Sequence, residues 1–284
     1  NDKDRKKLPT RFAPSPTGFL HIGHAYSALT AWNISTRSDG KFILRIEDID
    51  YQRCKEKYEK SIFQDMEWLG MIWLKPVINQ KNRLMYYQQA IEILNKKNLL
   101  YPCSCSRKDL NTALLALSHE NDQVNCLHTC RKRSMAGRTH NDNIRLNIDK
   151  AIIYIKNLKY KNLTFIENFD HNYTRIVELG SQFLQDDIVI ARKDIGTSYH
   201  LSVVVDDAYQ NITHVVRGND LLNSTPVQRL LQIILKLPEP RYHHHKLITD
   251  DKNSKLAKKQ QSKSLRSYIE EGLTLKTLKK QFNF

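Results

Sequence analysis

The stretch that decides the fold is RFAPSPTGFLHIGH, which runs from Arg11 to His24. Its first three residues suit the end of a short strand, its two prolines impose a stiff extended turn, and an amphipathic run with helical spacing opens at His21. A strand, a turn and a helix start in this order direct free backbone N–H groups and the positive end of a helix dipole at one point. With an arginine and two histidines beside it, this point suits the binding of a polyphosphate.

The size and charge of the chain limit the kinds of protein that it can be. Its 284 residues are enough for about two domains, and 40% of them are hydrophobic, which is enough for real cores. The formal net charge of +15 attracts polyanions, so nucleic acid is the first candidate partner. Residues 1–10 carry no signal-peptide pattern, and no apolar run approaches the length that spans a membrane. We therefore expect a cytoplasmic protein without a membrane partner.

Four of the five cysteines lie close together, whereas Cys54 stands apart. The clustered cysteines are Cys103, Cys105, Cys126 and Cys130. Two thiolates from each side of a small insertion can close a tetrahedral zinc site, so we expect one structural Zn²⁺ per chain. Unpaired buried thiols are the alternative, and His128 is a candidate to replace one sulfur. We expect no metal at the histidine run 243–245, because neighbours in a strand point to opposite faces.

Hydrophobic periodicity predicts alternating strands and helices on both sides of the cysteine-rich insertion. The predicted strands are residues 41–46, 152–155, 163–166, 201–205 and 212–216. The predicted helices are residues 58–69, 83–97, 108–117, 225–235 and one or two within 265–278. Such an alternation indicates an α/β protein with a doubly wound parallel sheet.

Acidic side chains follow two of the predicted strands. Glu47 comes directly after strand 41–46, and ligands of open parallel sheets bind at the carboxyl ends of strands. This carboxylate therefore suits a cationic group of a substrate. Asp206 and Asp207 follow strand 201–205, where they either bind magnesium or form a capped, solvated turn.

Several stretches, in order along the chain, resemble the motifs of class I aminoacyl-tRNA synthetases in the form found in glutamyl enzymes. They are HIGH at 21–24, GKFILRIEDID at 40–50, TSYHLSVVVDD at 197–207, HVVRG at 214–218 and KLAKK at 255–259. The last one departs from the second ATP motif of the class, Lys-Met-Ser-Lys-Ser, at Ala257 and Lys259. The resemblance implies the Rossmann-like fold of this class and ATP-dependent activation of glutamate. It also singles out His244, which matches a histidine common in the family.

The resemblance further implies which residues form the site. The glutamate pocket would be lined by Arg11, Phe12, Ala13, Pro14, Ser15, Glu47, Tyr199 and Arg217. ATP would lie against His21, Gly23, His24, Lys255 and Lys258. The two histidines and Lys258 would be catalytic, because they stabilise the phosphates. Mg²⁺ would be bound to the substrate ATP. Glu47 would meet the amino group of glutamate, and either of the two arginines would bind a carboxylate.

By the same resemblance the chain divides into four parts. We expect a first half of the Rossmann-like catalytic domain at 1–100, a zinc-containing insertion of the acceptor-binding type at 101–182, a second catalytic half at 183–237, and the KLAKK loop with a small helical extension at 238–284.

The C-terminal part of the sequence indicates which tRNA hydroxyl group accepts glutamate. Too few residues follow Lys259 for the helical anticodon-binding domain of full glutamyl-tRNA synthetases, and RGNDLL at 217–222 departs from their Arg-Gly-Glu-Asp-His wording. In both respects the chain resembles the short paralogues of these enzymes, which place glutamate on queuosine in the anticodon loop of tRNA(Asp). L-Glutamate, ATP and tRNA(Asp) bearing queuosine are then the expected partners of a monomer. The alternatives are the catalytic half of a full glutamyl-tRNA synthetase, a class I-like nucleotidyltransferase, and a zinc-containing RNA-binding module.

Overall fold

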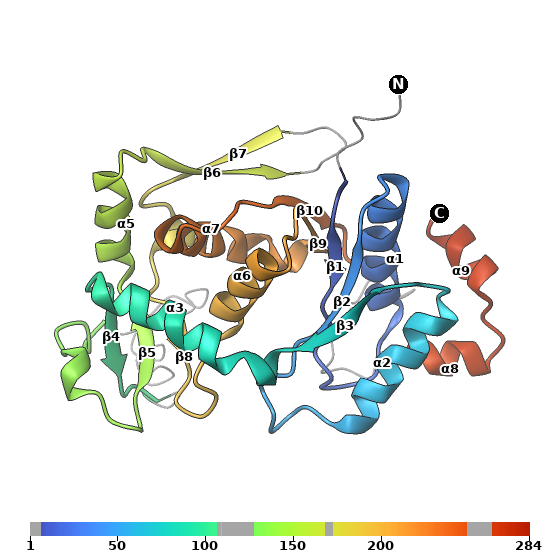
Figure 1. Ribbon diagram of the computed structural model, residues 1–284, viewed down its shortest axis with the longest axis horizontal. Helices are drawn as coiled ribbons and strands as arrows, with labels where there is room; N and C mark the ends of the chain where they lie inside the picture. The colour runs from blue at the N-terminus through green and yellow to red at the C-terminus, as the bar shows by residue number, and fades with distance from the viewer. Residues whose placement is uncertain (1–6, 107–108, 110–127, 168–172, 249–262) are drawn as a thin grey trace, which may run out of the picture.

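The computed structural model describes residues 7–106, 109, 128–167, 173–248 and 263–284, and a seven-stranded sheet lies at its centre (Figure 1). Across the sheet the strands are β3 (Leu74–Asn79), β2 (Phe42–Ile46), β1 (Thr10–Phe12), β9 (His214–Gly218), β10 (Arg241–His245), β6 (Asn162–Glu167) and β7 (Tyr173–Glu178). Neighbouring strands are parallel except for β6 and β7, which form an antiparallel hairpin at one edge. The predicted α/β fold with a doubly wound parallel sheet is confirmed.

Helices cover both faces of this sheet (Figure 1). One group comprises α1 (Ile22–Arg37), α2 (Glu56–Trp68), α8 (Leu265–Glu270) and α9 (Leu275–Gln281). The other comprises α3 (Leu84–Lys96), α5 (Ile148–Asn157), α6 (Tyr199–Tyr209) and α7 (Thr225–Leu235). Two hydrophobic cores result because side chains alternate along each strand. In β2, Leu44 and Ile46 pack toward the first group of helices, whereas Ile43 packs toward the second.

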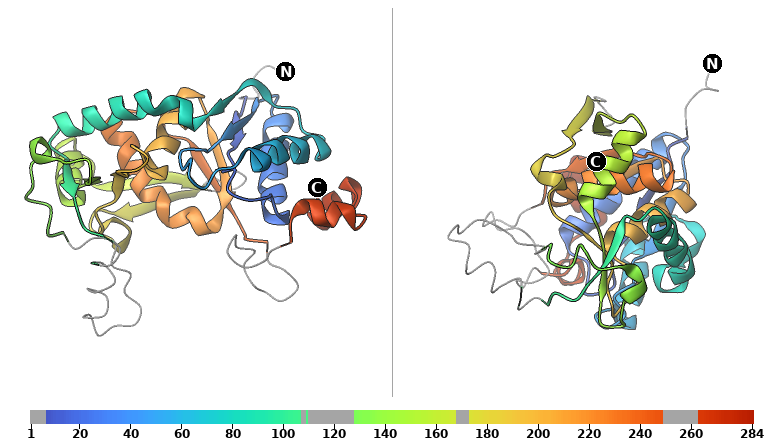
Figure 2. Two further views of the ribbon diagram at one scale, coloured as in Figure 1. Left: turned by 90° about the horizontal axis from the view of Figure 1, so that it is seen from below. Right: turned by 90° about the vertical axis from the view of Figure 1, so that its left-hand side faces the viewer.

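A second, antiparallel sheet lies at the opposite end of the molecule from α8 and α9 (Figures 1 and 2). Its strands are β4 (Leu100–Cys103), β5 (Asn143–Leu146) and β8 (Val189–Ala191). Short 3-10 turns occur at Gln80–Arg83, Met135–Gly137, Gln182–Leu184 and Asn219–Ser224. The β6–β7 hairpin extends the main sheet, because β6 pairs in parallel with β10.

Most predicted elements are present, several of them with shifted ends. The strands at 41–46, 163–166 and 212–216 correspond to β2, β6 and β9, and the helices at 58–69, 83–97 and 225–235 correspond to α2, α3 and α7. The C-terminal region 265–278 forms two short helices, α8 and α9. The predicted helix at 108–117 lies outside the described residues except for Asp109, so it stays a prediction.

Two predicted strands are wrong. Residues 201–205 belong to helix α6, and residues 152–155 belong to helix α5. In α5 the buried side chains Ile148, Ala151, Ile152 and Ile155 follow helical spacing, a signal that the shorter apolar window concealed. In α6 three consecutive valines favour a strand by propensity, but contacts with α3 and α7 bury the segment as a helix.

Candidate active site

The candidate site lies where the strand order reverses, between β1 and β9. The chain progresses outward from β1 to β2 on one side and from β9 to β10 on the other, so the carboxyl ends of these strands surround a crevice. A cavity of about 440 Å³ occupies this crevice. All described residues predicted for glutamate and ATP line it: Arg11, Phe12, Ala13, Pro14, Ser15, His21, Gly23, His24, Glu47, Tyr199 and Arg217. The other two, Lys255 and Lys258, lie outside the described residues.

The start of α1 forms one wall of the cavity. His21 is the N-cap, and its Nδ1 accepts a hydrogen bond from the backbone N–H of Gly23 at 3.1 Å. In return, the backbone N–H of His21 donates to Nδ1 of His24 at 3.1 Å, and the two ring centroids lie 3.7 Å apart. A Cβ atom on Gly23 would approach Cε1 of His21 to 3.0 Å, so glycine lets the ring fold over the helix start. The two rings are therefore held at the positive end of the helix dipole.

Arg217 is a buried cation of the cavity wall. Its side chain contacts neutral groups: Nη1 donates to Gln228 at 2.8 Å, Nη2 donates to Thr225 at 2.7 Å, and Nε donates to Nε2 of His244 at 3.0 Å. Nη1 also lies 3.5 Å from the hydroxyl of Tyr199. Within the described ranges, no carboxylate forms an ion pair with this guanidinium. A buried charge normally requires a partner, so the site suits an anion.

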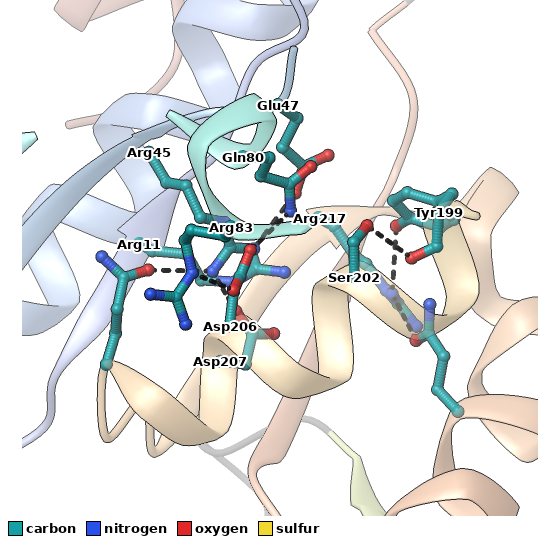
Figure 3. A network of polar contacts seen from close by, with 12 residues as sticks. Arg11, Arg45, Glu47, Gln80, Arg83, Tyr199, Ser202, Asp206, Asp207 and Arg217 are labelled. Atoms are coloured by element: carbon teal, nitrogen blue, oxygen red, sulfur yellow. Dashed lines mark hydrogen bonds and ion pairs between the residues drawn. The ribbon is translucent and has the colours of Figure 1, made fainter. Parts of the chain in front are cut away.

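Arg11 differs from Arg217 because it already has a counter-ion. Its Nε donates to Oδ1 of Asp207 at 3.0 Å, and Nη1 of Arg45 donates to the same oxygen at 2.7 Å (Figure 3). Although burial opposes ionisation, the two guanidinium groups hold the pKa of Asp207 below its usual range. Of the two arginines predicted to bind a carboxylate, Arg217 is therefore the one without a carboxylate partner in the described part of the chain.

Glu47 faces both the cavity and this buried network. Its Oε1 accepts a hydrogen bond from Nη2 of Arg45 at 3.0 Å. Burial raises the pKa of Glu47, and the charges of Arg45 and Arg11 oppose that rise. No local pattern in the sequence marks the role of Arg45, because only the register between β1 and β2 and the position of α6 bring its partners together.

Asp206 and Asp207 are not exposed ligands for magnesium, nor do they form a solvated turn. Both are buried in α6. Asp206 accepts hydrogen bonds from Nε of Arg83 at 2.6 Å, from the hydroxyl of Tyr87 at 2.7 Å and from Nε2 of Gln80 at 2.8 Å (Figure 3). Both interpretations of this pair therefore fail, since each carboxylate is already occupied by arginines.

A second cavity, of about 970 Å³, adjoins the first and shares the wall residues Ser15, Glu47 and Tyr199 with it. Three buried polar atoms just before α6 and at its start have no hydrogen-bond partner among the described residues: Oγ1 of Thr197, Oγ of Ser198 and Nδ1 of His200. Burial and the charge of Arg217 lower the pKa of His200 to about 4, so its ring is neutral. The motif TSYH at 197–200 contains these residues, but its resemblance singled out only the tyrosine.

Cationic side chains also line the second cavity. Arg53 and Arg192 both contact Asp50, at 2.9 and 3.1 Å, and Lys193 lines the same cavity. Cys105 of the cysteine cluster belongs to the same wall. Carboxylates line the same cavity, among them Glu47, Asp50 and Asp194, so it combines neutral hydrogen-bonding groups with paired charges of both signs.

The cysteine cluster lies beside the second sheet. The Sγ atoms of Cys103, Cys105 and Cys130 all lie within 4.8 Å of one another, and those of Cys105 and Cys130 are 3.8 Å apart. A tetrahedral zinc ion with Zn–S bonds of about 2.3 Å requires sulfur–sulfur distances of about 3.8 Å, so these thiols fit such an ion. Cys126 lies outside the described residues. The described cluster does not include His128, whose Nε2 lies 4.0 Å from Oδ2 of Asp187.

His244 and His245 of β10 have separate environments. His244 contacts Arg217 and Glu167, whereas Nε2 of His245 lies 2.6 Å from Oγ of Ser27 at the first cavity. The described metal-ligand cluster contains none of the three histidines of β10. In the part of the chain that the structure describes, no helix is long and apolar enough to cross a membrane.

A mostly parallel sheet with this strand order, and a histidine-capped helix at its switch point, match the catalytic domain of a class I aminoacyl-tRNA synthetase, which is a ligase. The model of the family "tRNA synthetases class I (E and Q), catalytic domain" matches residues 7–279. The chain therefore belongs to this family. Its members use an amino acid, ATP and tRNA as substrates.

Individual relatives differ in length. The chain is 40% identical to a Glutamyl-Q tRNA(Asp) synthetase from Rhodobacter capsulatus, over 93% of this chain and 95% of that protein. It is 36% identical to a Glutamate--tRNA ligase from Oleidesulfovibrio alaskensis, over 94% of this chain and 54% of that protein. The crystal structure of Glutamate-tRNA Synthetase from Elizabethkingia anophelis matches with a TM-score of 0.70 at 25% identity, over 94% of this chain and 54% of that one. The chain thus spans about half the length of both glutamate–tRNA ligases.

Proposed function

We propose that this protein activates L-glutamate with ATP and transfers the glutamyl group to queuosine of tRNA(Asp). The observation that carries the choice of amino acid is Arg217, which is buried in the cavity wall without a carboxylate partner among the described residues. The side-chain carboxylate of glutamate supplies the missing anion. Glu47, in the same cavity, receives the ammonium group of the substrate.

Activation joins glutamate to the nucleotide in the first cavity. An α-carboxylate oxygen of glutamate attacks the α-phosphorus of ATP, and the bond from this phosphorus to the bridging oxygen breaks, which releases pyrophosphate. His21 and His24, at the start of α1, stabilise the phosphates, and Mg²⁺ accompanies ATP. Lys255 and Lys258 contribute charge from the KLAKK segment. Positioning and charge stabilisation account for catalysis, so no side chain acts as nucleophile.

Transfer uses the second cavity, which shares the wall of Ser15, Glu47 and Tyr199 with the first. A hydroxyl of the queuosine diol attacks the carbonyl carbon of the adenylate, AMP leaves, and the hydroxyl proton passes to the released phosphate. Neutral hydroxyl side chains line this cavity, among them Thr197, Ser198 and Tyr199, and they suit a neutral diol because a hydroxyl group both donates and accepts hydrogen bonds. The lining of this cavity carries charges of both signs, so attraction of the phosphate backbone of an anticodon loop rests on the formal net charge of +15 of the whole chain.

The choice of queuosine rests on similarity. The chain aligns with 95% of a relative named for tRNA(Asp), at 40% identity, and with 54% of a relative named Glutamate--tRNA ligase, at 36% identity. The second match favours one alternative, attachment of glutamate to the 3′ end of tRNA(Glu).

Two assays test the proposal. Glutamate-dependent exchange of pyrophosphate into ATP tests activation, and charging of tRNA(Asp) with radioactive glutamate, with and without queuosine, tests transfer. We expect exchange with glutamate and charging only of the queuosine-containing anticodon stem-loop. Charging of the 3′ end of tRNA(Glu) would establish the alternative, and exchange driven by other acids but not glutamate would exclude both.

We also propose a structural zinc ion in the insertion. Cys103, Cys105 and Cys130 hold it together with Cys126. The ion fixes the wall that Cys105 contributes to the second cavity, so it supports transfer without taking part in the chemistry.

A further inference from the structure

The carboxylate-binding arginine is backed by a histidine and a second carboxylate that no part of the proposed chemistry uses. His244 lies directly opposite Arg217 in the parallel pairing of β10 with β9. Glu167, the last residue of β6, lies opposite Tyr242 of β10, so its side chain reaches the residue two positions further along the strand. These three residues form a row across three neighbouring strands.

The distances in this row define a chain of hydrogen bonds. Glu167 accepts at both oxygens: Oε1 from the backbone N–H of His244 at 2.9 Å, and Oε2 from Nδ1 of the same residue at 2.6 Å. On the other side of the ring, Nε of Arg217 lies 3.0 Å from Nε2 of His244. The side chains of His244 and Glu167 are 2% and 5% exposed, so water does not compete for these bonds.

The guanidinium group of Arg217 determines which atom donates in each hydrogen bond of this row. A guanidinium nitrogen only donates, so Nε2 of His244 must accept and the proton of the neutral ring must be on Nδ1. The carboxylate of Glu167 stabilises this tautomer, because it accepts the proton of Nδ1. Burial and the charges of Arg217 and Arg175 lower the pKa of His244, against the effect of Glu167, which agrees with a neutral ring.

We propose that Glu167 and His244 are positioning residues that orient Arg217 toward the side-chain carboxylate of the amino-acid substrate. Without Glu167 the ring is free to carry its proton on Nε2, where it would face the N–H of Arg217 and displace the guanidinium. The proposal rests on the function proposed above for Arg217. It gives the β6–β7 hairpin, at the edge of the sheet, a part in selecting glutamate.

The test measures glutamate-dependent pyrophosphate exchange by the full chain and three variants. In Glu167→Ala we expect the KM for glutamate to rise about tenfold, which corresponds to the loss of one well-oriented charge-assisted hydrogen bond, while the KM for ATP changes less than about twofold. His244→Gln retains one donor and one acceptor, so it should stay closer to the wild type than His244→Phe. Leu163→Ala is the control, because Leu163 is buried on the same strand as Glu167, near its other end.

A double-mutant comparison separates the loss of Arg217 positioning from a general destabilisation of the protein. In an Arg217→Lys background there is no Nε donor to orient, so Glu167→Ala should add no further increase to the KM for glutamate. The proposal is overturned if Glu167→Ala matches Leu163→Ala, or if its effect persists unchanged in the Arg217→Lys background. Exchange by the wild type with unaffected variants overturns this proposal alone, whereas the absence of glutamate-dependent exchange in the wild type overturns the proposed function as well.

Discussion

Nη1 of Arg45 donates a hydrogen bond to Oδ1 of Asp207 at 2.7 Å, although the two residues are 162 positions apart in the chain. Both side chains are buried, and Nε of Arg11 donates to the same oxygen. The contact joins β2 to α6 directly behind the cavity that contains Glu47. Asp207 therefore contributes both to the stability of the fold and to the geometry of the site.

Asp207→Asn should destabilise the protein strongly. The substitution leaves two buried guanidinium groups without their shared counter-ion, for which we expect a loss of about 3–5 kcal/mol in the free energy of unfolding. Urea denaturation measures it. Asp39→Asn is the control, since Asp39 pairs with Lys7 at the exposed surface and should change stability by less than about 0.5 kcal/mol. A loss below about 1 kcal/mol for Asp207→Asn would contradict the account of this network.

Arg217→Lys should reduce activity with glutamate. Lysine keeps the charge but loses the paired donors of a guanidinium, so kcat/KM for glutamate should fall about 10- to 100-fold, which corresponds to about 1.5–3 kcal/mol. Pyrophosphate exchange at varied glutamate concentration measures the change. Arg37→Lys, at the exposed end of α1, should behave as the wild type. Equal activity of both variants would mean that another group binds the carboxylate.

The cysteine cluster should bind one metal ion. We expect metal analysis to find about one zinc per chain in the wild type and much less in Cys105→Ser, which also lowers the melting temperature. Cys54→Ser should keep its zinc, because Cys54 lies outside the described cluster. Zinc-free wild-type protein with an unchanged melting temperature would exclude the structural role.

Acid should destabilise the protein through a buried histidine. Burial and the charge of Arg241 lower the pKa of His214 to about 4, whereas an unfolded histidine titrates near 6.5. Between these values the unfolded state binds more protons, so stability falls as the pH drops from about 6.5 to 4, by up to about 3 kcal/mol for this residue. His200 adds to the same slope. His214→Gln should reduce the slope in urea titrations at several pH values, and an unchanged slope would refute this origin.

Gly40→Ala should destabilise the protein near Leu8, just before β1 begins. An added Cβ would lie 2.5 Å from the carbonyl oxygen of Leu8 and 2.7 Å from its carbon, and these backbone atoms cannot move aside without displacing the strand. We expect a loss of about 1–3 kcal/mol in thermal or urea unfolding. At Gly137 nothing lies within 4 Å of an added Cβ, so Gly137→Ala is the matched control. Similar stabilities for the two variants would show that the chain near Leu8 adapts freely.

The elements that the sequence predicted are those with a local signature. Helix α7 shows this most clearly, because residues 225–235 have apolar spacing of period 3.6 and the structure begins and ends the helix at the same residues. Helix α6 shows where prediction from local sequence patterns fails. Its valines suit a strand locally, and only its burial against α3 and α7 makes the segment helical.

The sequence by itself determined the α/β class, the strand, turn and helix start from Arg11 to His24, and the clustering of the cysteines, because each depends on residue types at short spacing. Only the tertiary structure decided that Asp207 serves Arg11 and Arg45, that Arg217 lacks a counter-ion among the described residues, and that Glu167 reaches His244. These contacts depend on sheet register and on which helix covers which face. Such long-range pairings leave no periodic trace along the chain, so a local pattern cannot specify them.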